Sequence, residues 1–132
     1  MVISIWLGIC LEANIFAKPC ISFSEAIALQ QQVKQIGVSE RIKRYLVDLV
    51  SATRCAEGVQ LGSSPRGSLA LMKVAQALAL FDGYEFVTPE HVRELAVMVI
   101  AHRLAMQPQA RFSGHTAVDV VQDILKSVPV PA

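Results

Sequence analysis

The residues best suited to do chemistry lie at 61–68 (LGSSPRGS), where Ser64, Pro65 and Arg66 come just before a long apolar run. A serine side chain can accept a hydrogen bond from a free backbone N–H at a helix start, and proline loses no hydrogen bond in the first helical position. Arg66 would then project from the first turn, where unpaired N–H groups carry partial positive charge. A guanidinium there favours an anion, above all a phosphate. The pattern equally allows Arg66 to close a surface ion pair near a loop.

The element that must position Arg66 is the apolar run of residues 69–81, which predicts a long helix. Arg66, Lys73 and Gln76 are the residues that break its apolar surface. A helix that is apolar on most sides is expected to lie at the centre of a bundle. Arg66 would therefore stand at the mouth of the most buried element.

Four further helices are predicted from capping residues and hydrophobic periodicity. Ser22, Ser39, Thr88 and Thr116 are the expected caps, for helices over residues 23–35, 39–54, 89–106 and 116–126. In the second of these the apolar stripe consists of Ile42, Tyr45, Leu46, Leu49, Val50 and Thr53. The i,i+4 pairs of Arg44 with Glu40 and Asp48 would lie on its wet side. The chain is therefore predicted to be all-α, a small bundle of about five helices, with loops at 55–60 and 107–115.

Composition supports one packed domain. The 132 residues are 53% hydrophobic and 17% charged, which argues against disorder. The net charge of +1 gives no reason to expect nucleic acid or an anionic membrane as a partner. Cys10, Cys20 and Cys55 are odd in number and lack C-x-x-C spacing, so reduced thiols in the cytoplasm are expected. The three histidines lack metal-ligand spacing as well, and no metal site is predicted.

Two other residues allow a functional interpretation. Arg54 could be a second anion contact or a subunit-facing group, or only a cation that suits the C-terminal end of a helix. His102 could take part in acid–base chemistry, but no nucleophile or carboxylate stands at a telling distance in the sequence. A hydrogen-bonded packing histidine is the alternative.

Several stretches, taken in order, resemble the C-terminal lid domain of the MoxR-type AAA+ ATPases. They are residues 38–39, 45–50, 53–54, 61–68, 84–92, 102–104 and 128–131. The likeness runs from about residue 21 to residue 131, and residues 61–68 resemble the sensor 2 motif. In that family the sensor 2 arginine reaches from the lid to the γ-phosphate of ATP on the large domain. The resemblance implies that Arg66, with Ser64 and Pro65, helps to bind ATP, while the large domain holds Mg²⁺.

The resemblance also implies partners. They are the AAA+ large domain, neighbouring subunits of a ring that is expected to be a hexamer, and von Willebrand A-type proteins. In the family the lid moves with nucleotide state and couples hydrolysis to chaperone-like remodelling in the cytoplasm.

Residues 1–20 form an atypical apolar segment before the predicted lid domain of residues 21–132. The apolar run at 2–11 is about half as long as a membrane span requires. It lacks the basic start and the cleavage site of a signal peptide. Packing on the core or on a partner is expected, without a membrane span. Because this start does not resemble the end of an ATPase core, the chain is predicted to be a C-terminal piece of a longer protein.

No G-x-x-x-x-G-K-[ST] phosphate loop occurs in the sequence, and no acidic residue follows a strand-like run to hold Mg²⁺. The chain by itself is therefore not expected to hydrolyse ATP or to contain a catalytic residue. The alternative function is a non-catalytic helical protein-interaction module. The turn at residues 86–89 also resembles histone-like folds, although the near-neutral charge disfavours a DNA-binding version.

Overall fold

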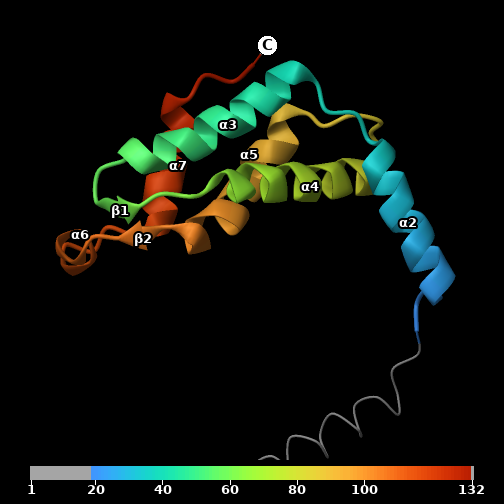
Figure 1. Ribbon diagram of the computed structural model, residues 1–132, viewed down its shortest axis with the longest axis horizontal. Helices are drawn as coiled ribbons and strands as arrows, with labels where there is room; N and C mark the ends of the chain where they lie inside the picture. The colour runs from blue at the N-terminus through green and yellow to red at the C-terminus, as the bar shows by residue number, and fades with distance from the viewer. Residues whose placement is uncertain (1–18, 132) are drawn as a thin grey trace, which may run out of the picture. The chain divides into compact units, whose positions relative to one another are not determined.

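The computed structural model describes residues 19–131, and in that range it is predominantly helical (Figure 1). The elements are α2 (Phe23–Gln35), α3 (Glu40–Cys55), β1 (Val59–Leu61), α4 (Pro65–Phe81), α5 (Pro89–Ile100), the 3₁₀ helix η1 (Ala101–Arg103), β2 (Ala105–Met106), α6 (Pro108–Phe112) and α7 (Ala117–Ser127). The prediction of a helical bundle is confirmed, with six α-helices in the described range where about five were expected. The described residues fall into two units, residues 19–30 and residues 31–131. The predicted boundary after residue 20 remains a prediction.

The core of the larger unit is built from one face each of α3, α4, α5 and α7. Helix α3 buries the whole predicted stripe, so the 3.6-residue periodicity located this face correctly. Helix α7 buries Val120, and Val118, which was expected inside, is 41% exposed. Over a helix of only three turns, periodicity defines the buried face to within about one residue, and the packing of α7 determines which residues are buried.

Helix α4 is not surrounded on all sides, and that prediction was wrong. It buries a single stripe at four-residue spacing, made of Gly67, Leu71, Ala75 and Ala79. Because three of these four side chains are small or absent, neighbouring helices can approach α4 closely. α4 packs against α3 and α5 along this stripe. Other apolar side chains of α4 stay open to solvent, with Leu69 55%, Val74 41% and Phe81 77% exposed.

Two short antiparallel strands form where loop and helix were expected. Val59 of β1 lies opposite Met106 of β2, and Leu61 lies opposite Ala105. Helix α5 therefore ends at Ile100, short of the predicted end near Met106. The segment after β2, expected as a loop, contains α6 and lies beside β1 at one end of the unit (Figure 1). The residues that pair are more than forty positions apart, so local sequence signals could not reveal the sheet.

Local capping chemistry works as predicted at all four of these helices. The Ser22 hydroxyl accepts from the Glu25 N–H at 3.3 Å, and the Glu25 carboxylate accepts from the Ser22 N–H at 2.6 Å. The Ser39 hydroxyl accepts a hydrogen bond from the Ile42 N–H at 3.3 Å. Thr88 and Thr116 each form a reciprocal capping box with the residue three positions on. The expected pair of Glu40 with Arg44 is replaced by an ion pair of Glu40 with Lys43 at 2.6 Å. The expected and the observed ion pair both lie on the exposed side of α3, where such pairs contribute little to stability.

The capping box of α7 predicts a dependence of stability on pH. The Thr116 hydroxyl and backbone N–H donate to the Asp119 carboxylate at 2.6 and 2.9 Å, and these hydrogen bonds lower the pKa of Asp119. Because the folded pKa lies below the unfolded one, this stabilisation is present above the unfolded pKa of about 4 and is lost as the pH falls through the folded value. Asp119→Asn should therefore lower the free energy of unfolding at neutral pH, and the difference from wild type should shrink in acid.

Chemical denaturation from pH 7 to pH 3 measures this difference. Glu94→Gln is the control, because Glu94 is exposed and makes no hydrogen bond in the described part of the chain. A difference for Asp119→Asn that stays constant across this pH range would show that the charge of the carboxylate does not stabilise the cap.

The Tyr45 side chain carries a buried hydroxyl that has no hydrogen-bond partner among the described residues. The residue is 2% exposed. Leaving a buried polar group unpaired costs roughly 1–3 kcal/mol. Tyr45→Phe should therefore keep or raise the free energy of unfolding, by up to about 1 kcal/mol, when measured by urea denaturation. A loss of more than about 1 kcal/mol would instead reveal a partner for the hydroxyl, such as a buried water.

Candidate functional site

Arg66 lies in the first turn of α4, with Pro65 at the first helical position and Ser64 at the N-cap. All three residues are exposed. The ion pairs within residues 19–131 join Lys43 to Glu40, His91 to Asp82 and Lys126 to Asp123. In this range Arg66 makes neither an ion pair nor a hydrogen bond. The alternative interpretation, a surface ion pair of Arg66, is therefore not supported, because no carboxylate pairs with Arg66 in the described part of the chain.

The predicted side-chain cap of α4 was wrong. Ser64 has the extended backbone of an N-cap residue, but its hydroxyl accepts no capping hydrogen bond. The Gly67 N–H instead donates to the Ser64 carbonyl oxygen at 2.8 Å. Proline in the next position already fixes the backbone of the first turn. The Ser64 hydroxyl thus stays available at the same exposed helix end as the Arg66 guanidinium.

The loop that leads into α4 is held by the last turn of α3. The Ser63 N–H donates to Thr53 Oγ1 at 2.9 Å, and the Ser63 carbonyl accepts from Arg54 Nε at 3.3 Å. Arg54 thus sits in the last turn of α3 and binds the loop through Nε. From the sequence, Ser63 stood out only as part of the stretch 61–68, and Thr53 only in the buried stripe and the pair 53–54, with no role for either side chain. A polar side chain on that stripe was the available signal, because buried hydroxyl groups need partners.

His102 is exposed, and its Nδ1 atom lies 3.0 Å from the Met98 carbonyl oxygen. Arg103 Nε donates to the Val99 carbonyl at 3.0 Å. Both side chains fold back onto the last turn of α5, where carbonyl groups lack helical partners. The expectation of a hydrogen-bonded His102 is confirmed, although the ring is not packed in the core.

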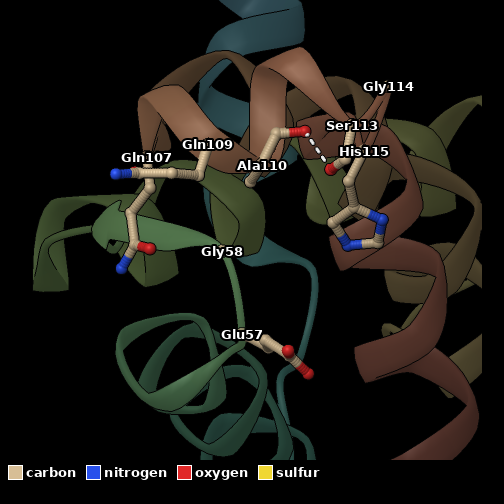
Figure 2. Close-up of a pocket in the computed structure, with 8 residues that line it drawn as sticks. All are labelled: Glu57, Gly58, Gln107, Gln109, Ala110, Ser113, Gly114 and His115. Carbon is tan, nitrogen blue, oxygen red and sulfur yellow. Dashed lines mark hydrogen bonds between the residues drawn. The ribbon is translucent and has the colours of Figure 1, made fainter.

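A cavity of about 700 Å³ lies between α6 and the turn that precedes β1 (Figure 2). Its lining consists of Glu57, Gly58, Gln107, Gln109, Ala110, Ser113, Gly114 and His115. The Ser113 hydroxyl donates to the Ala110 carbonyl at 2.9 Å (Figure 2). Within the described residues no hydrogen bond joins the His115 ring to Ser113 or Glu57. This cavity therefore shows no nucleophile–base pair, and Arg66 does not line it.

Residues 19–131 contain no group of three or more His, Cys, Asp and Glu side chains placed to hold a metal ion. Cys20 and Cys55 are free and exposed. No helix in the same range is long and apolar enough to cross a membrane. Cys10 and the apolar run at residues 2–11 lie outside the described residues.

Comparison with known proteins identifies the domain. Residues 51–124 match the family model of the AAA lid domain, a range that includes all of α4 and Arg66. The chain is also 31% identical over 124 residues to Chaperone MoxR1 of Mycobacterium tuberculosis, covering 87% of this chain and 33% of that protein. The chain belongs to the lid domains of the MoxR-family AAA+ ATPases. The resemblance to the MoxR-family lid domain is thereby confirmed.

Two further comparisons agree with this assignment to the MoxR-family lid. The uncharacterized protein YeaC of Bacillus subtilis is 41% identical over 114 residues, which cover 86% of this chain and 36% of that protein. A crystal structure of a protein from Cytophaga hutchinsonii, assigned as an ATPase, superposes with a TM-score of 0.73 at 27% identity. The superposed region covers 77% of this chain and 34% of the solved chain. The lid thus spans about a third of the length of the proteins it matches.

Proposed function

We propose that this lid contributes Arg66 as a sensor 2 residue to an ATP site whose phosphate loop and Mg²⁺ ligands lie on the large domain of a complete AAA+ protein. The observation that carries the proposal is the exposed guanidinium at the N-terminal end of α4, inside the matched lid, which has no ion-pair partner among residues 19–131. An arginine with a structural role would be expected to have a carboxylate partner. An arginine whose role is to bind a ligand needs no carboxylate partner in the absence of that ligand.

The electrostatics of this helix end suit a phosphate. The N-terminus of a helix carries about half a positive elementary charge, and Arg66 adds a full one beside it. Ser64 adds a hydroxyl that no capping bond occupies. Pro65 stiffens the connection between them. These residues can bind the end of a phosphate chain but offer no pocket for a base and a ribose, so ATP binding requires the large domain.

The packing of α4 offers a route by which nucleotide state would move the lid. The helix that carries Arg66 also buries Leu71, Ala75 and Ala79 against the rest of the bundle. A force on Arg66 would therefore act on the whole packed unit rather than on a loose side chain. In this proposal γ-phosphate loss releases Arg66, and the lid rotates as a body. That rotation would drive chaperone-like remodelling of a client protein in the cytoplasm.

The proposed partner of the exposed side of α4 is the large domain. Leu69 lies three residues after Arg66, which places both on neighbouring positions of the helix surface. Leu69 is 55% exposed although leucine is usually buried. If Arg66 reaches a nucleotide on the large domain, Leu69 must face that domain as well. Neighbouring subunits of a ring, expected to be a hexamer, and von Willebrand A-type proteins would contact other surfaces.

The test uses a complete AAA+ protein that carries this lid, for example a chimera in which it replaces the matching part of the Cytophaga hutchinsonii protein assigned as an ATPase. ATP hydrolysis and nucleotide affinity are measured for the parent and for Arg66→Ala. A lower hydrolysis rate with an unchanged melting temperature supports the proposal. Unchanged hydrolysis would leave the lid as a non-catalytic interaction module.

A further inference from the structure

The hydroxyl group of Thr53 has both of its hydrogen-bonding roles assigned by the structure. Thr53 is fully buried, and its Oγ1 donates to the Val50 carbonyl at 2.6 Å, within the same helix. The hydroxyl hydrogen is therefore committed to Val50. A lone pair of the same oxygen accepts the N–H of Ser63 at 2.9 Å. Thr53 thus holds the backbone of a loop residue from inside the core.

A second set of contacts holds the same loop, at Gly62 and Ser63, close to α3. The carbonyl of Ser63 accepts from Arg54 Nε, so consecutive residues of α3 hold the N–H and the C=O of one peptide segment. A Cβ atom added at Gly62 would lie 2.8 Å from the N, Cα and Cγ atoms of Arg54. Backbone atoms cannot move out of the way cheaply, so glycine is required there for this close approach.

The other side of Ser63 contacts α4. Ser63 is 0% exposed, and a Cβ added at Gly67 would overlap its hydroxyl oxygen. Ser63 is therefore wedged between the end of α3 and the first turn of α4. Two residues, Ser64 and Pro65, separate Ser63 from Arg66. Because the φ angle of proline is restricted, this connection is short and stiff.

We infer that Thr53 is a positioning residue that, through Ser63, fixes where Arg66 stands. This inference rests on the proposed function of Arg66. Without the Thr53 oxygen the Ser63 N–H loses its acceptor, and one of the two hydrogen bonds that join Ser63 to α3 within residues 19–131 is lost. The position of an arginine that must meet one phosphate group then becomes less well defined. Small misplacements of a group that acts on bound substrate have large effects on rate.

The first experiment measures the attachment itself in this chain. Thr53→Val keeps the shape of the side chain and removes the hydroxyl, whereas Thr53→Ser keeps the hydroxyl. Hydrogen exchange at the Ser63 amide should become about fivefold faster or more in Thr53→Val, the factor expected for one lost hydrogen bond, and should stay near the parent rate in Thr53→Ser. Equal exchange in the parent and in Thr53→Val would overturn the inference.

The second experiment places the same variants in the complete AAA+ protein, alone and combined with Arg66→Ala. Thr53→Val should lower ATP hydrolysis by about threefold or more, whereas Thr53→Ser should keep the rate near that of the parent. In a protein that already carries Arg66→Ala, Thr53→Val should cause no further loss of hydrolysis. An equal loss with and without Arg66 would show that Thr53 acts on the fold alone and would overturn the inference. If Thr53→Val does not fold, Thr53→Ala carries the same comparison, because it removes the same hydroxyl from the Ser63 N–H.

The outcomes separate the two proposals. If Arg66→Ala leaves hydrolysis unchanged, the function of Arg66 is refuted, and the amide exchange still reports whether Thr53 holds the loop. If Arg66→Ala lowers hydrolysis while Thr53→Val leaves it at the parent rate, only the positioning role of Thr53 is refuted.

Discussion

Arg66→Ala is expected to lower ATP hydrolysis of a complete AAA+ protein carrying this lid by at least about tenfold. A hydrogen bond to a charged group contributes roughly 1.5–3 kcal/mol, and each 1.4 kcal/mol of lost transition-state stabilisation costs a factor of about ten in rate. The melting temperature of the lid should change little, because Arg66 is exposed and has no partner within residues 19–131. Steady-state hydrolysis and thermal unfolding measure the two effects separately.

Two matched variants sharpen this experiment on Arg66. Arg66→Lys keeps the positive charge but loses the planar, bidentate donor, so it should recover only part of the rate. Lys73→Ala removes a cation from an exposed position two turns further along α4 and should leave hydrolysis near the parent value. A loss as large for Lys73→Ala as for Arg66→Ala would point to the net charge of the helix rather than to a specific contact. A large loss of lid stability in Arg66→Ala would return Arg66 to a structural role.

Leu71→Ala is expected to have the largest effect on stability. Leu71 is 0% exposed at the centre of the buried stripe of α4. Replacing a fully buried leucine by alanine costs about 2–5 kcal/mol, through lost burial and the cavity that remains. For a unit of this size the melting temperature should fall by about 10 °C or more. Urea denaturation and circular dichroism of the isolated chain measure the loss.

Leu69→Ala is the matched control, because it makes the same substitution two residues away on the same helix. Leu69 is 55% exposed, so the free energy of unfolding should change by less than about 1 kcal/mol. In the complete protein Leu69→Ala should instead reduce hydrolysis, because it removes the proposed apolar contact with the large domain. A lid that is destabilised equally by both substitutions would contradict the one-sided burial of α4. Unchanged hydrolysis in Leu69→Ala would contradict the proposed large-domain contact.

Features with a local cause could be predicted from the sequence. The buried stripe of α3 follows from the spacing of its apolar residues, and the caps Thr88 and Thr116 follow from their hydroxyls and the residues three positions on. The exposed place of Arg66 after Pro65 follows from the geometry of a helix start. These features involve residues within two or three turns of one another, so their interactions can be seen along the chain.

The tertiary structure decided whatever depends on residues distant in sequence. Helix α5 gives way to η1 at Ala101 and then to β2, which pairs with β1, although the sequence would have allowed more α-helix. Leu69 and Leu71 are equally apolar, so the sequence does not distinguish them. Leu71 is buried and Leu69 is exposed because α4 packs against α3 and α5 on one side. The hydrogen bond from Ser63 to Thr53 likewise forms only when the loop has folded back onto α3. The sequence by itself therefore determined five of the six described α-helices and the exposed place of Arg66 at a helix start, while only the assembled bundle determined the contacts that hold the preceding loop.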